Sequence, residues 1–168
     1  KEIATSQFKK PDAPHPVQVL FEFQTKGVAN ARATERLKEG VLEQVQASKL
    51  FSATTEGPAE GGALLSITLN NVVLTDDAAA KGFMTGLTFG LAGSQVTDGY
   101  ICTVRYRANA SSEAIVKEGR HALHTTLGAS SASQNATKAN SPDEAVIRMR
   151  RQVVSNVLHD LSHDAAFQ

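Results

Sequence analysis

The chain has 168 residues, in which 17 Lys and Arg balance 17 Asp and Glu, with one Cys, no Trp and an aromatic share of 5%. This length suits one domain with a substantial core, and the balanced charge and few aromatic rings argue against a nucleic-acid binder. The single Cys excludes an internal disulfide and leaves the redox compartment open.

The first sixteen residues, Lys1–Pro16, mix Lys, Pro and Ser and offer little apolar surface to bury. We expect a flexible leader at the start of a processed chain, and interpret it as a tether to an N-terminal lipid anchor that is not present in this sequence. The longest apolar run, of about thirteen residues, falls short of the roughly 20 that span a bilayer.

Apolar and polar residues alternate from Val17 to Gln24, which predicts a half-buried strand. Gly27 is expected to turn the chain, and Asn30 to cap a helix that runs to about Ser48. The inner face of this helix is predicted to be Ala33, Leu37, Val41, Leu42 and Val45.

Four more strands are predicted before the last helix. A short one at 51–55 is followed by turn residues at 56–62 and by a long strand whose alternation begins at Leu65. The stretch from Tyr100 to Tyr106 alternates in the same way, and residues 113–126 are expected to return as its hairpin partner.

The last helix has the clearest start in the chain, because Ser141, Pro142 and Glu144 match a capping box with Pro at the first helical position. Residues 129–140 before it have the composition of a linker, and the helix is expected to end near Ser162. Its predicted apolar face is Val146, Ile147, Val153, Val154, Val157, Leu158 and Leu161.

The order of these elements predicts an α+β fold. We expect a mostly antiparallel sheet of about five strands, with two amphipathic helices and one Gly-rich apolar helix. Residues 17–128 would form the domain, and residues 141–164 a C-terminal helix that packs on it.

Residues 78–93 depart furthest from an ordinary domain, with one charge, Lys81, and glycines at every fourth position. Each glycine inside a helix costs roughly 0.8–1 kcal/mol relative to alanine, so the spacing indicates a face that another backbone approaches closely. Asp76 and Asp77 are placed to stabilise the start of this helix. A buried core helix is the competing interpretation. We favour contact with a membrane or a partner through Gly82, Phe83, Gly86, Leu87, Phe89, Gly90 and Leu91.

His159 and His163 have the best spacing for a metal, since positions four apart share a helix face. Two ligands do not close a site, and a polar face near the helix C-terminus, where a charged His is favoured, is the simpler interpretation. His121 and His124, three positions apart, could chelate together on a helix, but on the strand expected here they would point to opposite faces and could not.

A single thiol and a group of arginines are the two other features of the sequence that bear on possible chemistry. Cys102 is expected to be a buried, inert thiol, because it lies on the inward face of its strand with no His or cation evident beside it. Arg148, Arg150 and Arg151, near Lys138, form a local basic patch, which is either a solvated face or a contact for anionic lipid headgroups.

The run GFMTGLTFGLAGSQVTDGYICTVRYRA, from Gly82 to Ala108, resembles a pattern in small bacterial cell-envelope lipoproteins, in which a neutral Gly/Leu/Thr segment lies between two strands. The resemblance covers about residues 16–128, and Ala92-Gly93-Ser94 stands where such segments often have a Pro-containing turn. It implies a periplasmic or outer-membrane location, no cofactor, and a non-enzymatic assembly, transport-accessory or stress role.

We therefore predict a non-enzymatic envelope domain whose partner is a membrane surface, an envelope protein or a second copy of the chain. The alternative is a small-ligand- or metal-binding protein or enzyme that uses His159 and His163, with His121 as a further ligand. A third hypothesis is a subunit that assembles through edge-strand pairing.

Overall fold

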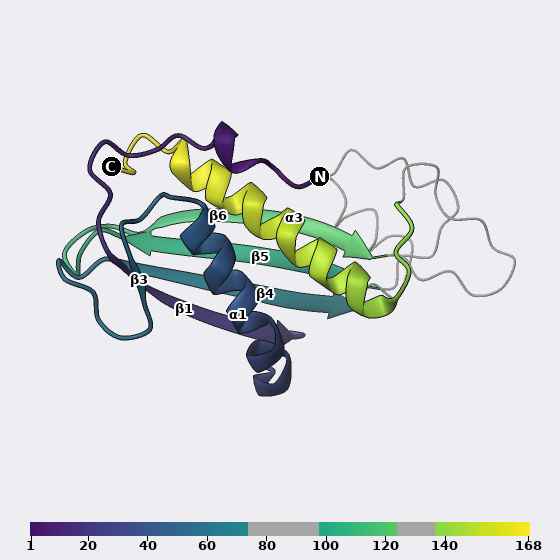
Figure 1. The fold of residues 1–168 in the computed structure, drawn as a ribbon. Coiled ribbons are helices and arrows are strands. Elements are labelled where there is room, and N and C mark those ends of the chain that lie inside the picture. Colours follow the sequence, from purple (N-terminus) through teal and green to yellow (C-terminus); the bar gives the residue numbers. More distant parts are fainter. Residues whose placement is uncertain (74–97, 124–136) are drawn as a thin grey trace, which may run out of the picture.

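Alternating apolar side chains build a mixed sheet with helices on one face, as the computed structural model shows for residues 1–73, 98–123 and 137–168 (Figure 1). In these residues the strands are β1 (Val17–Thr25), β2 (Val28–Ala29), β3 (Thr54–Thr55), β4 (Leu64–Val73), β5 (Asp98–Arg107) and β6 (Ile115–Leu123). The helices are α1 (Ala31–Ala47) and α3 (Pro142–Ser162), and a 3-10 turn, η1, spans Thr5–Gln7.

The strands lie in the order β2-β1-β4-β5-β6, and β3 pairs with the start of β1. β1 and β4 are parallel, since the chain crosses from one to the other through α1, whereas β5 runs antiparallel to both of its neighbours, β4 and β6. The predicted α+β fold with a mostly antiparallel sheet is confirmed. Residues 74–97, which include the predicted Gly-rich helix, lie outside the described residues. So do residues 124–136, which include most of the predicted linker.

Local signals place the first strand and helix as expected. Lys26 and Gly27 have φ of 52° and 78° and join β1 to β2 in a two-residue turn. The Ala33 N–H donates to Asn30 Oδ1 at 3.0 Å, which confirms the predicted N-cap of α1.

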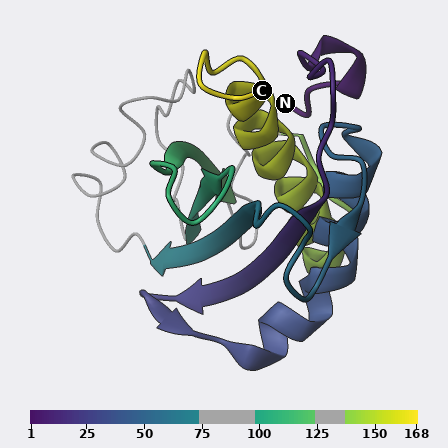
Figure 2. The same ribbon diagram turned by 90° about the vertical axis from the view of Figure 1, so that its left-hand side faces the viewer.

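The core lies between the inner face of the sheet and the two helices, which lie side by side on it (Figure 2). Each fully buried Val, Leu, Ile, Phe or Met side chain contributes about 1.5–3 kcal/mol to the stability of the fold. The inner face includes Val17, Val19, Phe23, Leu65, Ile67, Leu69, Tyr100, Cys102, Val104 and Tyr106, and α1 adds Leu37, Val41 and Val45.

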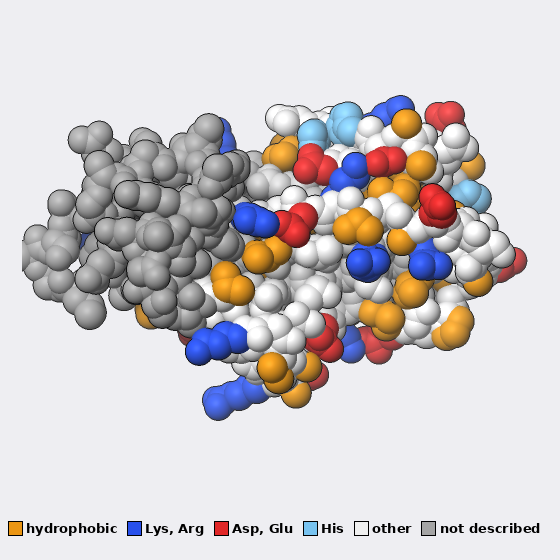
Figure 3. Space-filling view, turned by 180° about the vertical axis from the view of Figure 1, so that it is seen from behind, with side chains coloured by type: hydrophobic (Ala, Val, Ile, Leu, Met, Phe, Trp, Pro, Cys, Tyr) orange, Lys and Arg blue, Asp and Glu red, His pale blue; other side chains and the backbone are white. Residues whose placement is uncertain are grey.

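The opposite face of the sheet mixes apolar and charged side chains at its surface (Figure 3). Leu20 and Val116 are 46% and 45% exposed there, although both belong to strands. Both long helices of the described chain pack on the other face, so this one is open in the part that the structure describes.

The capping box of α3 forms with one change. The Glu144 N–H donates to Ser141 Oγ as predicted, but the Glu144 carboxylate accepts from the N–H of Asn140, one residue before the expected donor. The predicted face is confirmed for Val153, Val154, Val157, Leu158 and Leu161. It is wrong for Ile147, which is 46% exposed, because that side chain faces the groove beside α1, and Met149 fills the core in its place.

The expectation that residues 1–16 have little to bury is wrong. Phe8 is only 6% exposed, and the N–H groups of Ile3 and Lys9 donate to Ser155 Oγ and Ser162 Oγ on α3 at 3.0 and 3.1 Å. The segment therefore runs along α3, as Figure 1 shows in purple beside yellow. Alternation did not reveal this, because the segment buries only one aromatic ring, Phe8, just after η1, and its hydrogen bonds to the serines of α3 come from backbone N–H groups.

Candidate functional site

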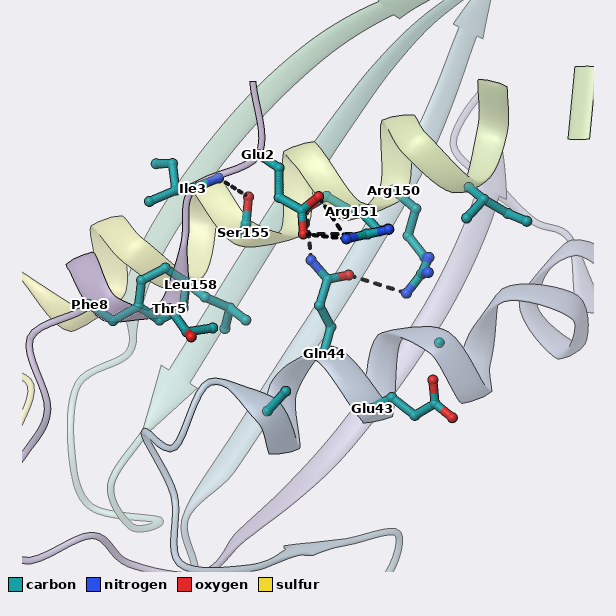
Figure 4. A pocket seen from close by; sticks show the side chains of 13 residues that line it. Glu2, Ile3, Thr5, Phe8, Glu43, Gln44, Arg150, Arg151, Ser155 and Leu158 are labelled. Atoms are coloured by element: carbon teal, nitrogen blue, oxygen red, sulfur yellow. Dashed lines mark hydrogen bonds and ion pairs between the residues drawn. The ribbon is translucent and has the colours of Figure 1, made fainter. Parts of the chain in front are cut away.

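A pocket of about 400 Å³ opens where the N-terminal segment meets α1 and α3 (Figure 4). Its volume is in the range of small-molecule sites, roughly 300–1,000 Å³. The apolar part of its wall is Ile3, Phe8, Ala47, Ile147 and Leu158, and its charged or amide side chains are Glu2, Glu43, Gln44, Arg150 and Arg151.

Arg150 reaches from α3 across this pocket to α1. Its Nη1 donates to Gln44 Oε1 at 3.2 Å, and Gln44 Nε2 in turn donates to the carbonyl oxygen of Arg151 at 2.7 Å. One amide side chain thus joins the two helices at this point.

Gly40 makes room for the Arg150 guanidinium. A Cβ built on Gly40 would lie 2.6 Å from Nη1 and 2.7 Å from Cζ, so a larger residue would displace the group. Glycine inside a helix costs about 1 kcal/mol relative to alanine, and this close approach is its structural reason. The site residues Gly40 and Gln44 were not predicted. A glycine in the middle of an amphipathic helix was the signal that could have indicated Gly40.

The three predicted patch arginines do not form one cationic surface. Arg148 pairs with Glu144 at 2.6 Å, and Arg151 pairs with Glu2 at 3.1 Å. Arg150 turns the other way and has no carboxylate within ion-pair distance in the described part of the chain. Burial lowers the pKa of Arg150, and its neighbour Arg151 adds to this effect. The guanidinium nevertheless stays charged at any ordinary pH, and the carboxylates of Glu43 and Glu2 attract it from beyond ion-pair distance.

His159 and His163 are brought together at the end of α3, with ring centroids 4.3 Å apart. His163 Nδ1 donates to the carbonyl oxygen of His159 at 3.0 Å, which leaves its Nε2 as the nitrogen able to bind a metal. His159 Nδ1 lies 3.2 Å from Asp160 Oδ1, and Phe8 packs edge-on against the His159 ring.

No third ligand joins this pair among the residues described: they contain no group of three or more His, Cys, Asp or Glu arranged to hold a metal. His121 lies on β6 opposite Tyr100. His124 falls outside the described residues.

Cys102 has the environment predicted for an inert thiol. It is fully buried, and burial raises its pKa to about 12. The thiolate needed for nucleophilic chemistry is therefore strongly disfavoured.

The predicted contact residues from Gly82 to Leu91 lie outside the described residues, but both ends of their segment are defined. Val73 in β4 pairs with Asp98 in β5, and Asn71 Nδ2 donates to Asp98 Oδ1 at 3.2 Å. The two residues that flank this segment are therefore paired neighbours in the sheet.

A scan against models of protein families finds no match to the chain, and a search of curated proteins finds no significant match. Within the described ranges, none of the helices combines the length and apolar character needed to cross a bilayer. The local geometry is therefore the basis for a functional proposal.

Proposed function

We propose that the chain is a non-enzymatic domain of a bacterial cell-envelope lipoprotein that contacts a membrane surface or a partner protein through residues 74–97. One observation carries the proposal: the β4–β5 ladder is continuous from the Leu64–Arg107 pair to the Val73–Asp98 pair. Residues 74–97 are thus an insertion between two strands whose described residues are paired in register up to the residues that flank it.

Long connections within compact domains are usually functional, because most connections are only about 4–6 residues long. This insertion contains the glycines at every fourth position and the apolar residues Phe83, Leu87 and Leu91. Small residues in such a row favour close approach to another backbone, and burying each large side chain would contribute about 1.5–3 kcal/mol. The composition and the position of the insertion together support a contact surface.

The envelope location rests on the resemblance of residues 82–108 to small envelope lipoproteins. In that setting the domain would have an assembly, transport-accessory or stress role. Contact with the membrane would be strengthened by an N-terminal lipid anchor, since two weak membrane signals together give stable binding.

Co-sedimentation of the 168-residue chain with anionic lipid vesicles, with light scattering on the same samples, tests the proposal. We expect Leu87→Asp to abolish vesicle binding or self-association while the circular dichroism spectrum stays unchanged. Val116→Asp is the matched control, because Val116 is a 45% exposed apolar residue that pairs with Arg105, towards the opposite end of β5 from Asp98, and it should leave binding intact.

A second variant replaces residues 74–97 by Asn-Gly, the residues best suited to a short hairpin turn. It should fold and lose the contact. Unchanged binding by either variant would overturn the proposal, and so would unfolding of the Leu87→Asp variant, since Leu87 would then belong to the core.

The closeness of the two C-terminal histidine rings favours a second candidate, a small-ligand- or metal-binding protein or enzyme that uses His159 and His163. Calorimetric titration with Zn²⁺ at neutral pH should then show stoichiometric binding that His163→Ala abolishes. Absence of tight binding would remove this candidate.

A further inference from the structure

The pocket between the N-terminal segment, α1 and α3 combines an apolar wall with a cation, Arg150, that has no carboxylate within ion-pair distance in the described part of the chain. Ile3, Phe8 and Leu158 supply the wall close to the N-terminal segment, and Arg150 stands at the α1 side (Figure 4). Such a combination, a mostly apolar cavity with a few polar groups that orient the ligand, is typical of small-molecule sites.

The Arg150 guanidinium has most of its N–H donors unused by the protein. In the described residues its single hydrogen bond goes from Nη1 to Gln44 Oε1, an uncharged acceptor. A guanidinium presents its donors as a planar fork that matches a carboxylate, and such charge-assisted bonds are roughly twice as strong as neutral ones. The other cation of the pocket is not available in this way, because Arg151 is paired with Glu2.

The remaining charges of the pocket favour a ligand with one negative charge. Glu43 and Glu2 also line the pocket, and their carboxylates attract Arg150 from beyond ion-pair distance. They repel an anionic ligand more strongly the higher its charge, so one negative charge is favoured over several. A monocarboxylate would pair with the free donors of Arg150, and an attached alkyl chain would lie against Ile3, Phe8 and Leu158.

We propose that this pocket binds a small amphiphilic monocarboxylate, with its carboxylate on Arg150 and its alkyl chain against Ile3, Phe8 and Leu158. Gly40 and Gln44 hold the guanidinium in place for this contact. The proposal does not depend on residues 74–97 or on the function proposed for them.

Isothermal titration calorimetry of the 168-residue chain with octanoate tests the site, with octanol and acetate as probes that lack the charge or the chain. We expect saturable binding of octanoate at one site and at least about tenfold weaker binding of each control probe. Octanol lacks the hydrogen bonds between a carboxylate and Arg150, and acetate lacks the apolar surface that the alkyl chain would bury. Equal binding of octanoate and octanol would overturn the role of Arg150, and no saturable octanoate binding would overturn the site.

Three variants locate the binding. Arg150→Gln should weaken octanoate binding by at least about tenfold, whereas Arg148→Gln should not change it, since Arg148 lies on the same helix and is paired with Glu144 outside this pocket. Ala47→Trp should also remove binding, because Ala47 is an exposed residue of α1 that lines the pocket, so a larger side chain fills the pocket without entering the core. Equal losses of octanoate binding in Arg148→Gln and Arg150→Gln would contradict the proposal. Retained binding in Ala47→Trp would also contradict it, and this test does not depend on the stability of Arg150→Gln.

Discussion

Lys117 Nζ lies 2.6 Å from Asp164 Oδ2, and this ion pair puts a charged residue on the inner side of β6, the strand at one edge of the sheet. Lys117 pairs in register with Val104, whose side chain is fully buried. Inward-pointing charges of this kind discourage an edge strand from pairing with a second sheet. The third hypothesis, assembly through edge strands, therefore meets a structural obstacle at β6.

Replacing this charge by an apolar residue should promote self-association. We expect Lys117→Val to sediment as a larger species than the parent chain at equal concentration, because the inward-pointing charge that discourages β6 from pairing with a second sheet is then removed. Sedimentation velocity measures the effect. Lys38→Val is the matched control, since Lys38 pairs with Glu56 away from this edge, and a Lys117→Val chain that sediments like it would contradict the prediction.

Gly119 allows α3 to approach β6 closely. A Cβ at this position would lie 3.1 Å from Val157 Cγ1 and 3.4 Å from Val153 Cγ2. We expect Gly119→Ala to lower the free energy of unfolding by about 1–3 kcal/mol, the usual cost of overpacking, as measured by urea denaturation. The cost should shrink in a Val157→Ala background, and an equal cost in both backgrounds would show that the contact is not its cause.

The contact between Gly40 and Arg150 should appear as coupling between two substitutions. In an Arg150→Ala background, Gly40→Ala should stabilise the protein by about 1 kcal/mol, its gain in helix propensity. In the parent chain the gain should be clearly smaller, because the new methyl group displaces the guanidinium from Gln44. A double-mutant cycle by urea denaturation measures the difference, and equal gains would refute the contact.

Stability should fall at alkaline pH through Cys102. Burial raises the pKa of its thiol from 9.0 to about 12, so the folded protein keeps a proton that the unfolded chain releases above pH 9. This contribution is fully present below pH 9 and is lost as the pH rises towards 12, with a slope of at most about 1.4 kcal/mol per pH unit. The urea midpoint of Cys102→Ala should therefore decline less steeply over this interval than that of the parent. If the urea midpoints of the parent and Cys102→Ala decline equally, the loss of stability comes from other groups. Tyr100 is the first candidate, since burial raises its pKa to about 12 as well.

Phe8 should anchor the N-terminal segment to α3. We expect Phe8→Ala to accelerate hydrogen exchange at the Ile3 and Lys9 amides, which are bonded to α3 in the parent. The loss of stability should be smaller than the roughly 3–5 kcal/mol of a central Phe→Ala change, because the segment can detach instead of leaving a cavity. Gln7→Ala, an exposed change in the same 3-10 turn, is the control and should exchange at the parent rate.

Short-range chemistry explains which elements could be predicted. Alternation identified β1, β4 and β5, and the side chains of Asn30 and Ser141 identified two helix starts, because strand period and capping depend on residues only a few positions apart. Helix faces were predicted less completely. Ile147 was predicted to be buried but is exposed, and Met149, which was not predicted, is buried in the core. The reason is that α3 faces both the sheet and the groove beside α1.

Long-range contacts explain what could not be predicted. The parallel pairing of β1 with β4 joins strands that are separated by α1, and neither strand alone specifies the direction of its partner. The Arg150 site depends on Gly40 from another helix, and the burial of Phe8 depends on residues near the other end of the chain. Composition had instead indicated a flexible leader.

The contacts between the N-terminal segment and α3 can form only late in the synthesis of the residues described. Ile3 and Lys9 are synthesised long before Ser155 and Ser162, the residues to which their amides donate. Until Ser155 and Ser162 have been synthesised, Phe8 therefore has no complete α3 to pack against, and a product that stops before Ser155 lacks the α3 contacts that bury this ring. The entropy cost of closing a loop rises only slowly with loop length. The time at which this segment docks is therefore limited by the synthesis of α3 more than by the search for the docked conformation.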